Sequence, residues 1–259
     1  MGEPGDEASA SEAPGAAAAA LARGLPGGIA VSRLRVYDWP TSDGRMGGSP
    51  HLHTTSTEGY VVLAGSGELE SLSSRGLETT PLHPGAVVWF TPGTVHRLIN
   101  GSGDLDILTL MSNAGLPEAG DAVLTFPAEV LGDPERYAAA AALPQTDDQA
   151  ELERAARARR DLALEGWAEL RAQAQADLDA ALSALYTAAA RLVAPKTARW
   201  QAIWRGGPAA QSEATGSALA SLAAAGTESL YGSGVGTLAP LSGPERWGMC
   251  GRLTVWPLV

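Results

Sequence analysis

Short apolar runs, each closed by residues that favour turns, dominate the chain between Ile29 and Phe126. Glycine, proline, aspartate and asparagine separate these runs at regular intervals. The clearest runs cover residues 34–37, 60–63, 87–90 and 105–111. Such runs are too short for typical helices, and many short strands with regular turns are typical of a sandwich or barrel. We therefore expect residues 28–127 to form one β-sandwich or β-barrel.

After Phe126 strand-forming residues become scarce, and Ala, Leu, Glu, Arg and Gln dominate. Asp133 followed by Pro134 is typical of a helix N-cap and the first helical position. One apolar helix stripe, with spacings of four and three residues, consists of Leu178, Leu182, Leu185, Ala189 and Leu192. These patterns predict an α-helical region over residues 128–226.

Helix boundaries inside that region follow from proline and glycine. Pro195 should end or restart the helix that carries the first stripe, and residues 200–204 form a second, tryptophan-rich stripe. We expect residues 206–207, both glycine, to stop the second helix and Pro208 to open a third. Simple helix-on-helix packing is the favoured interpretation of these stripes; a lid, a dimer interface or a partner-binding surface are the alternatives.

The two ends of the chain have a different composition. Residues 1–27 are rich in Ala, Gly, Pro, Ser and Glu and lack periodic large apolar residues, which predicts a disordered tail. Residues 227–247 return to Gly, Ser and Pro, and residues 253–256 read as one strand. We expect residues 227–259 to form a loop and a strand that returns to pair with the edge of the β domain.

Charge and cysteine content limit the function classes. The 259 residues carry a formal net charge of −11, which disfavours binding to nucleic acid. One arginine cluster is interpreted as the solvated face of a helix and contains Arg154, Arg157, Arg159 and Arg160. Cys250 is the single cysteine, so no disulfide forms within the chain. The N-terminus is acidic, lacks a secretory signal pattern and contains no membrane span, so we expect a cytoplasmic protein.

Three of the four histidines stand in an arrangement typical of a metal site. His51 and His53 are two residues apart and share one face of a strand. Glu58 follows after a polar bend, on a strand that can point its carboxylate back at the histidine pair. His96 comes from a distant strand and supplies a third imidazole. His83, the remaining histidine, is expected in a surface turn.

These four side chains, His51, His53, Glu58 and His96, offer three nitrogen donors and one oxygen donor. Such a mixed set suits one divalent transition metal, namely iron, manganese, nickel, zinc or copper, rather than calcium. Four protein ligands on an octahedral ion leave two positions open for a substrate or for dioxygen. The residues therefore predict one divalent metal ion with room for a small molecule beside it.

The same residues resemble the two sequence motifs of the cupin superfamily. His51, His53, Glu58 and Gly65 match the first motif; Gly85, Gly93, His96 and Asn100 match the second. A glycine usually found before the first histidine is replaced, and the proline usually found before Gly93 is moved by one residue. The resemblance implies a cupin-type β-barrel, or jelly roll, with a helical extension after it. It also implies a possible homodimer, because cupins often pair through barrel strands.

Further residues are candidates for the surroundings of the predicted site. Tyr60 shares the face of Glu58, so both are candidate catalytic residues, with plain barrel packing as an equal alternative for Tyr60. Four further side chains are candidates for the substrate pocket: Met46, Trp89, Asn100 and Arg252. Cys250, in the same C-terminal segment as Arg252, is interpreted as buried and inert, with a place near the barrel mouth as the alternative.

Three functions fit these features. The first is an iron(II)-dependent oxygenase acting on a small organic molecule. The second is a redox-neutral metalloenzyme, such as a sugar isomerase, epimerase or decarboxylase, which would need a general base. The third is a non-enzymatic cupin that binds or senses a small ligand. The ligand set is common to all three, so the sequence leaves the reaction, the substrate and the metal open.

Overall fold

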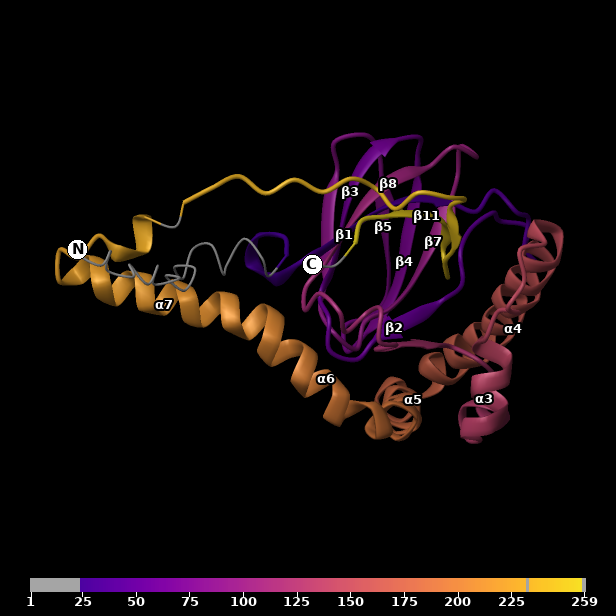
Figure 1. Ribbon diagram of the computed structural model, residues 1–259. Coiled ribbons are helices and arrows are strands. Elements are labelled where there is room, and N and C mark those ends of the chain that lie inside the picture. The colour runs from indigo at the N-terminus through magenta and orange to yellow at the C-terminus, as the bar shows by residue number, and fades with distance from the viewer. Residues whose placement is uncertain (1–23, 232, 258–259) are drawn as a thin grey trace, which may run out of the picture.

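The computed structural model describes residues 24–231 and 233–257, and in it two antiparallel β-sheets face each other as a jelly roll (Figure 1). The prediction of a β domain followed by helices is confirmed. The predicted N-terminal tail falls outside the described residues except for its last part, where Pro26–Gly28 form the short 3-10 helix η1.

Six strands form one sheet and five form the other. In spatial order the first sheet contains β10 (Arg246–Trp247), β11 (Gly251–Val255), β1 (Ala30–Val36), β8 (Asp106–Met111), β3 (Glu58–Ala64) and β6 (Val87–Phe90). The second contains β5 (Gly76–Leu82), β4 (Gly67–Ser73), β7 (Val95–Asn100), β2 (His51–His53) and β9 (Ala122–Leu124). Strand β11, in the C-terminal segment, pairs antiparallel with β1.

The motif glycines serve the turns that end two strands. Gly65 follows β3 with φ +73, and Gly93 precedes β7 with φ +87. A side chain is strained in this left-handed region, which glycine adopts readily. At Gly65 a Cβ atom would also lie 2.7 Å from the backbone of Asp104.

One face of the five-stranded sheet lines the barrel interior and the other face packs against the helices, as strand β2 shows. All three of its residues are buried. His51 and His53 face the barrel interior, whereas Leu52 belongs to the core between sheet and helices. Strand β7 behaves in the same way, because Leu98 packs inside the barrel and Val95 packs on the helix side. The five-stranded sheet is therefore covered on both faces.

Helices follow the barrel between residues 128 and 223, with one loop at residues 142–148. Their bounds are α2 (Ala128–Leu131), α3 (Pro134–Ala141), α4 (Gln149–Ala176), α5 (Leu178–Val193), α6 (Thr197–Trp204) and α7 (Ala210–Ala223), with short turns η2 (Ala194–Lys196), η3 (Arg205–Ala209) and η4 (Glu228–Leu230). The predicted N-cap at Asp133 is confirmed, because its carboxylate accepts hydrogen bonds from the backbone of Glu135 and Arg136.

Helices α4 and α5 lie along the barrel and bury their apolar stripes against the five-stranded sheet (Figure 1). Trp167 of α4 is 2% exposed, and the α5 residues Leu182, Leu185 and Ala189 pack in the same core. The predicted stripe on α5 thus faces the barrel as well as its neighbouring helix.

The predicted helix stop at residues 206–207 is wrong. A π-helical turn, Arg205–Ala209, joins α6 to α7 instead. Proline lacks an amide hydrogen and its ring clashes with the carbonyl four residues earlier, and a wider turn accommodates Pro208 without ending the helix. The two glycines keep helical geometry here, since a glycine ends a helix only where the chain turns left-handed.

The interpretation of the arginine cluster as a solvated face holds for Arg154, which is exposed, but is wrong for Arg160. Arg160 is 2% exposed and donates hydrogen bonds to the carbonyls of Trp39 and Pro40, at 3.1 and 3.2 Å. Arg157 lies over the ring of Trp39, 4.2 Å from its centroid. Helix α4 is therefore anchored to the barrel loop around Trp39, whose carbonyl oxygens accept the guanidinium protons.

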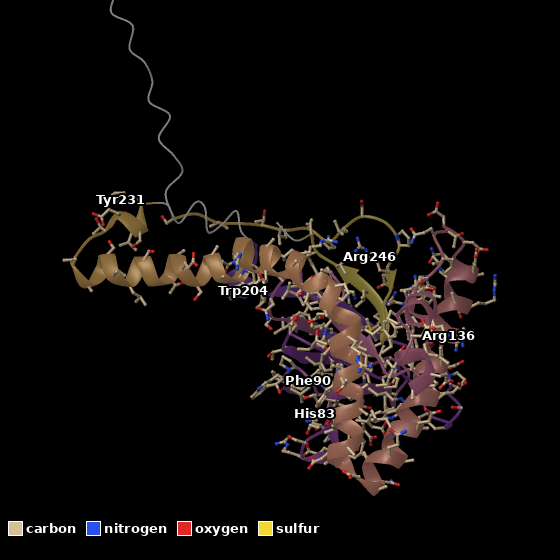
Figure 2. All side chains as sticks on the ribbon, turned by 90° about the horizontal axis from the view of Figure 1, so that it is seen from below. His83, Phe90, Arg136, Trp204, Tyr231 and Arg246 are labelled. Atoms are coloured by element: carbon tan, nitrogen blue, oxygen red, sulfur yellow. The ribbon has the colours of Figure 1, made fainter. Side chains whose placement is uncertain are left out.

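Helices α6 and α7 leave the barrel as an arm (Figure 1). In Figure 2 Trp204, the last residue of α6, lies partway along the arm and Tyr231 at its far end. The chain then runs back in extended form to β10 and β11. Within the described residues, none of the helices combines the length and apolarity that crossing a bilayer requires.

Candidate metal centre

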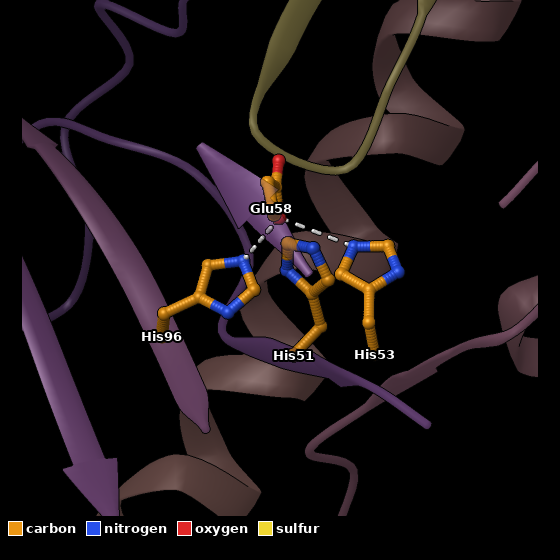
Figure 3. Close-up of side chains that lie close together, drawn as sticks. All are labelled: His51, His53, Glu58 and His96. Carbon is orange, nitrogen blue, oxygen red and sulfur yellow. Dashed lines mark ion pairs between the residues drawn. The ribbon is translucent and has the colours of Figure 1, made fainter. Parts of the chain in front are cut away.

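Four side chains from three strands converge inside the barrel: His51 and His53 from β2, Glu58 from β3 and His96 from β7 (Figure 3). His51 and His96 are directly paired across the sheet. Glu58 reaches them from the opposite sheet, at the first residue of its strand. All four are buried, so the sequence prediction that they come together is met by the geometry.

The donor atoms are spaced as ligands of one ion would be. Glu58 Oε2 lies 3.2 Å from both His53 Nε2 and His96 Nε2. Two ligands at right angles, each about 2.1 Å from an ion, stand about 3.0 Å apart. One donor atom from each of the four residues lies within 4.8 Å of the others. Glu58 Oε2 and His96 Nε2 are buried without a well-oriented hydrogen bond, so the cluster is able to hold a metal ion.

Each imidazole is held from behind through Nδ1, which leaves Nε2 facing the centre. His53 Nδ1 lies 2.7 Å from Asp121 Oδ1, and His51 Nδ1 lies 3.0 Å from the carbonyl oxygen of Ser49. His96 Nδ1 lies 3.2 Å from the carbonyl oxygen of Thr94. Such partners fix the ring orientation and the tautomer of metal-ligating histidines.

The electrostatics of the metal-free cluster follow from burial and close charges. Burial opposes the imidazolium form of His53, but Asp121 and Glu58 outweigh it and raise the pKa of His53 to about 10. Burial alone would raise the pKa of Glu58, yet His53 and His96 hold that pKa well below its ordinary value. Burial and the neighbouring imidazoles lower the pKa of His51. A cation at the centre would replace the proton on His53 as the partner of Glu58.

A cavity of about 510 Å³ opens onto the cluster. Three of the ligands, His51, His53 and Glu58, lie in its wall. Most of the remaining wall is apolar and comes from the six-stranded sheet and the C-terminal segment, including Leu34, Met111, Met249, Leu253, Val255 and Trp256. This size and composition are typical of a small-molecule site.

Tyr60 lies close to the cluster but outside the wall of this cavity. It is 1% exposed and packs edge-on against Phe90, with ring centroids 5.4 Å apart. Burial, then the charge of Glu58 and a hydrogen bond with it, raise the pKa of Tyr60 well above its usual value. These features suit a hydrogen-bond donor that positions Glu58 better than a general base.

The four predicted pocket residues lie elsewhere, and each has a structural reason. The Asn100 amide donates to the carbonyl of Val36 at 3.0 Å, and its oxygen accepts from the backbone of Gly103 and Leu105. Asn100 therefore shapes a turn.

Trp89 is 72% exposed on β6, the edge strand of its sheet, where alternation points it outward. Met46 belongs to the isolated bridge with Pro40 and stands near Gly103 instead of the cluster. Arg252 lies over the ring of Trp247, 3.7 Å from its centroid, and donates to the carbonyl of Glu245.

Asp121 lies at the site although no sequence pattern predicts it there. Cys250 and Arg159 also lie at the site, although the favoured interpretation of each was a place elsewhere. Asp121 is fully buried behind His53, and a lone aspartate in a loop gives no pattern to detect. Cys250 is buried in the cavity wall, with Sγ 3.9 Å from His51 Nδ1; burial, then Glu58, raises the pKa of its thiol. Arg159 of α4 also lines the cavity, although its cluster suggested solvent exposure. His83 is exposed, as expected.

Part of this chain is similar to known proteins. Residues 42–111 match the family model of the cupin domain. Curated proteins gave no match. Among solved structures, KdgF from Halomonas sp. is 25% identical with a TM-score of 0.24, over 26% of this chain and 58% of that chain. This chain therefore spans little more than half the length of that relative.

Two other solved structures are similar at lower identity. A protein with a double-stranded beta-helix domain from Klebsiella pneumoniae is 18% identical with a TM-score of 0.25, over 32% of this chain and 64% of that chain. WlaRA from Campylobacter jejuni, a TDP-fucose-3,4-ketoisomerase, is 15% identical with a TM-score of 0.29, over 35% of this chain and 64% of that chain.

Residues 42–111 match the cupin domain, and the two facing sheets and the buried His, His, Glu, His cluster agree with that match. The chain therefore contains a cupin domain, and a helical region follows its barrel. Its cluster is able to bind a metal ion of the kind that nitrogen and oxygen donors suit.

Proposed function

We propose that this cupin is a metal-dependent enzyme acting on a small organic molecule, and specifically an iron(II)-dependent oxygenase. One observation carries the proposal: Glu58 Oε2 stands 3.2 Å from the Nε2 atoms of His53 and His96, at the wall of a cavity of about 510 Å³. A bound iron(II) ion would supply the redox chemistry with dioxygen that the side chains themselves lack.

The chain's own residues would hold the ion and shape the reaction space. His51, His53, Glu58 and His96 would be the ligands, and a Glu58 carboxylate bound to the ion would be a poor proton acceptor. The apolar wall would exclude water from the reacting molecule. Tyr60, which hydrogen-bonds with Glu58, would keep that carboxylate oriented.

The oxygenase is preferred over the redox-neutral alternative because an isomerase, epimerase or decarboxylase needs a general base. Among the described residues that line the cavity, the titratable groups besides the ligands are Glu118, Arg159, Arg246 and Cys250. Glu118 and Arg246 are exposed, and the pKa of Cys250 is raised by burial, so its thiol stays protonated at neutral pH. None of them is suited to abstract a proton inside the cavity.

Oxygen uptake tests the proposal. The metal-free protein is loaded anaerobically with iron(II) and mixed with a panel of small organic acids, sugars and aromatic compounds, while dissolved oxygen is recorded. We expect substrate-dependent oxygen consumption in the wild type and in His83→Gln, a matched change at an exposed histidine. His96→Gln should lose it. Turnover without oxygen, or equal turnover with zinc, would contradict the oxygenase and support the redox-neutral enzyme.

A further inference from the structure

Arg159 is the one residue of the helical region that lines the metal-centre cavity. It comes from α4, outside the barrel, and is half-buried. Its Nη2 donates to the carbonyl of Gly248 at 2.7 Å, and its Nη1 to the carbonyl of Ala141 at 3.3 Å. These two hydrogen bonds fix the position of the guanidinium, and some of its N–H groups remain available to donate to a ligand.

No carboxylate pairs with Arg159 among residues 24–231 and 233–257. The groups whose charges act on it are Tyr37, Cys250 and Tyr137, and its Nε is buried without a hydrogen-bond partner. A buried guanidinium without a counter-ion is costly, because desolvation is not compensated by a nearby negative charge. The adjacent Arg160 already anchors α4 to the barrel loop, so anchoring does not explain Arg159.

Arg159 and the metal cluster both contact the short segment of residues 248–250. Arg159 donates to Gly248, and Cys250, two residues later, has its sulfur 3.9 Å from His51 Nδ1. Cα atoms two residues apart are separated by at most about 7 Å. One small molecule can therefore reach both groups across the cavity.

The rest of the wall restricts the chemistry of that molecule. Leu34, Met111, Leu253 and Val255 are apolar, and Thr109 offers a buried hydroxyl without a hydrogen-bond partner. A single guanidinium matches a single negative charge, and arginine pairs with a carboxylate through two parallel hydrogen bonds. A phosphate dianion would carry a second negative charge, and among the described residues of the wall the only side-chain cation besides Arg159 is the exposed Arg246.

We propose that Arg159 binds the carboxylate of the substrate, and that this cupin acts on carboxylic acids with an apolar body. The inference rests on the proposed function, since it names the substrate class of the same cavity. The helical region then has a role in recognition, because it supplies the half-buried cation of the wall, whereas the other arginine of the wall, Arg246 of β10, is exposed.

Binding measurements with a redox-inert metal test the assignment without turnover. The full chain is loaded with zinc, and its affinities for 3-phenylpropanoate, hexanoate and cyclohexanecarboxylate are compared by calorimetry with those for the corresponding uncharged amides. We expect at least one acid to bind about tenfold or more tightly than its amide, as a charge-assisted pair implies. Arg159→Gln should remove this preference, Arg159→Lys should keep part of it, and Arg154→Gln, an exposed residue of the same helix, should leave it unchanged.

Zinc affinity and thermal unfolding are measured for every variant. Should Arg159→Gln fail to fold, Arg159→Lys and the acid-to-amide comparison carry the test. Equal affinity for acids and amides, no binding of any acid at millimolar concentration, or an Arg159→Gln variant that binds like the wild type would each overturn the proposal. An acid preference that needs zinc but not Arg159 would assign the carboxylate to the metal, overturning this inference while leaving the metal site intact.

Discussion

His53 Nδ1 and Asp121 Oδ1 lie 2.7 Å apart, and this pair joins the metal-binding face of the barrel to a loop 68 residues later. Asp121 is fully buried. Its second carboxylate oxygen accepts hydrogen bonds from the Thr55 hydroxyl and from the Ser56 amide, each at 3.0 Å. The carboxylate is thus held in place and in turn fixes the ring of His53, as carboxylates behind metal-ligating histidines do.

Asp121→Asn should weaken metal binding without removing a ligand. Loss of a partner behind a ligating histidine typically lowers metal affinity about 10- to 100-fold. Asparagine keeps nearly the same volume and can still accept from Ser56, so we expect the fold to survive. Zinc affinity measured by competition with a chelator provides the check. Asp147→Asn, at an exposed position before α4, is the control; an Asp121→Asn protein with wild-type affinity would contradict the role.

Metal affinity should rise with pH. The pKa of His53 is raised to about 10 in the metal-free cluster, so this imidazole carries a proton at neutral pH. The pKa of His51 is lowered, so that imidazole is already neutral. Metal binding should therefore release about one proton from His53, and affinity should increase up to about tenfold per pH unit between pH 6 and 8. Calorimetry in buffers of different ionisation enthalpy counts the protons; a heat that does not depend on the buffer would exclude this release.

The metal-free protein should show the opposite trend. The pKa of His53 is about 10 in the folded state against an ordinary value of 6.5, so the charged His53 stabilises the fold fully below pH 6.5. That contribution is lost as the pH rises through 10. Urea denaturation of the metal-free protein at several pH values should therefore show a stability decline on the alkaline side, reduced in Asp121→Asn. An equal decline in both proteins would assign it to other groups.

Metal should stabilise the fold through the four ligands alone. A ligand at one hundred times its dissociation constant adds about 2.7 kcal/mol to the free energy of unfolding. Zinc should raise the melting temperature of the wild type and of His83→Gln, and a chelator should reverse the rise. His96→Gln, which removes a fully buried donor, should show little or no rise. A full rise in His96→Gln would mean that zinc binds elsewhere.

Leu52→Ala should destabilise the protein although the site keeps its ligands. Leu52 is 1% exposed and lies between the two histidines of β2, on the face covered by the helices. Truncating a buried leucine costs about 2–5 kcal/mol, because a cavity remains. Leu219→Ala is the matched control, since this leucine of the arm is 63% exposed and should change stability by less than about 0.5 kcal/mol. Chemical denaturation measures both, and equal effects would refute the packing role of Leu52.

Local sequence pattern was sufficient to predict the strands, the apolar stripe on α5 and the four candidate metal ligands. Strand alternation places His51 and His53 on one face whatever the rest of the chain does. The spacing to Glu58 and His96 matched the cupin motifs, and the structure brings those four donors together. The N-cap at Asp133 was equally local, because a side chain that accepts from the next two amides needs no distant partner.

Other features depended on contacts between distant segments. Trp89 and Tyr60 lie on the neighbouring strands β6 and β3, but the packing of the two sheets decides which face of each strand is buried. The glycines at 206–207 read as a stop, yet a π-helical turn carries the chain past them. Asn100 matched its motif but shapes a turn instead of lining the cavity.

By itself the sequence determined the two-part architecture and the four side chains that cluster as candidate metal donors, since both follow from spacings along the chain. The tertiary structure decided what surrounds those donors. Asp121 lies behind His53, Cys250 stands beside His51, and Arg159 of α4 enters the cavity wall. The reason is physical: a ligand pair two residues apart is set by strand geometry, whereas a counter-charge or a wall residue is set by which distant surfaces pack together.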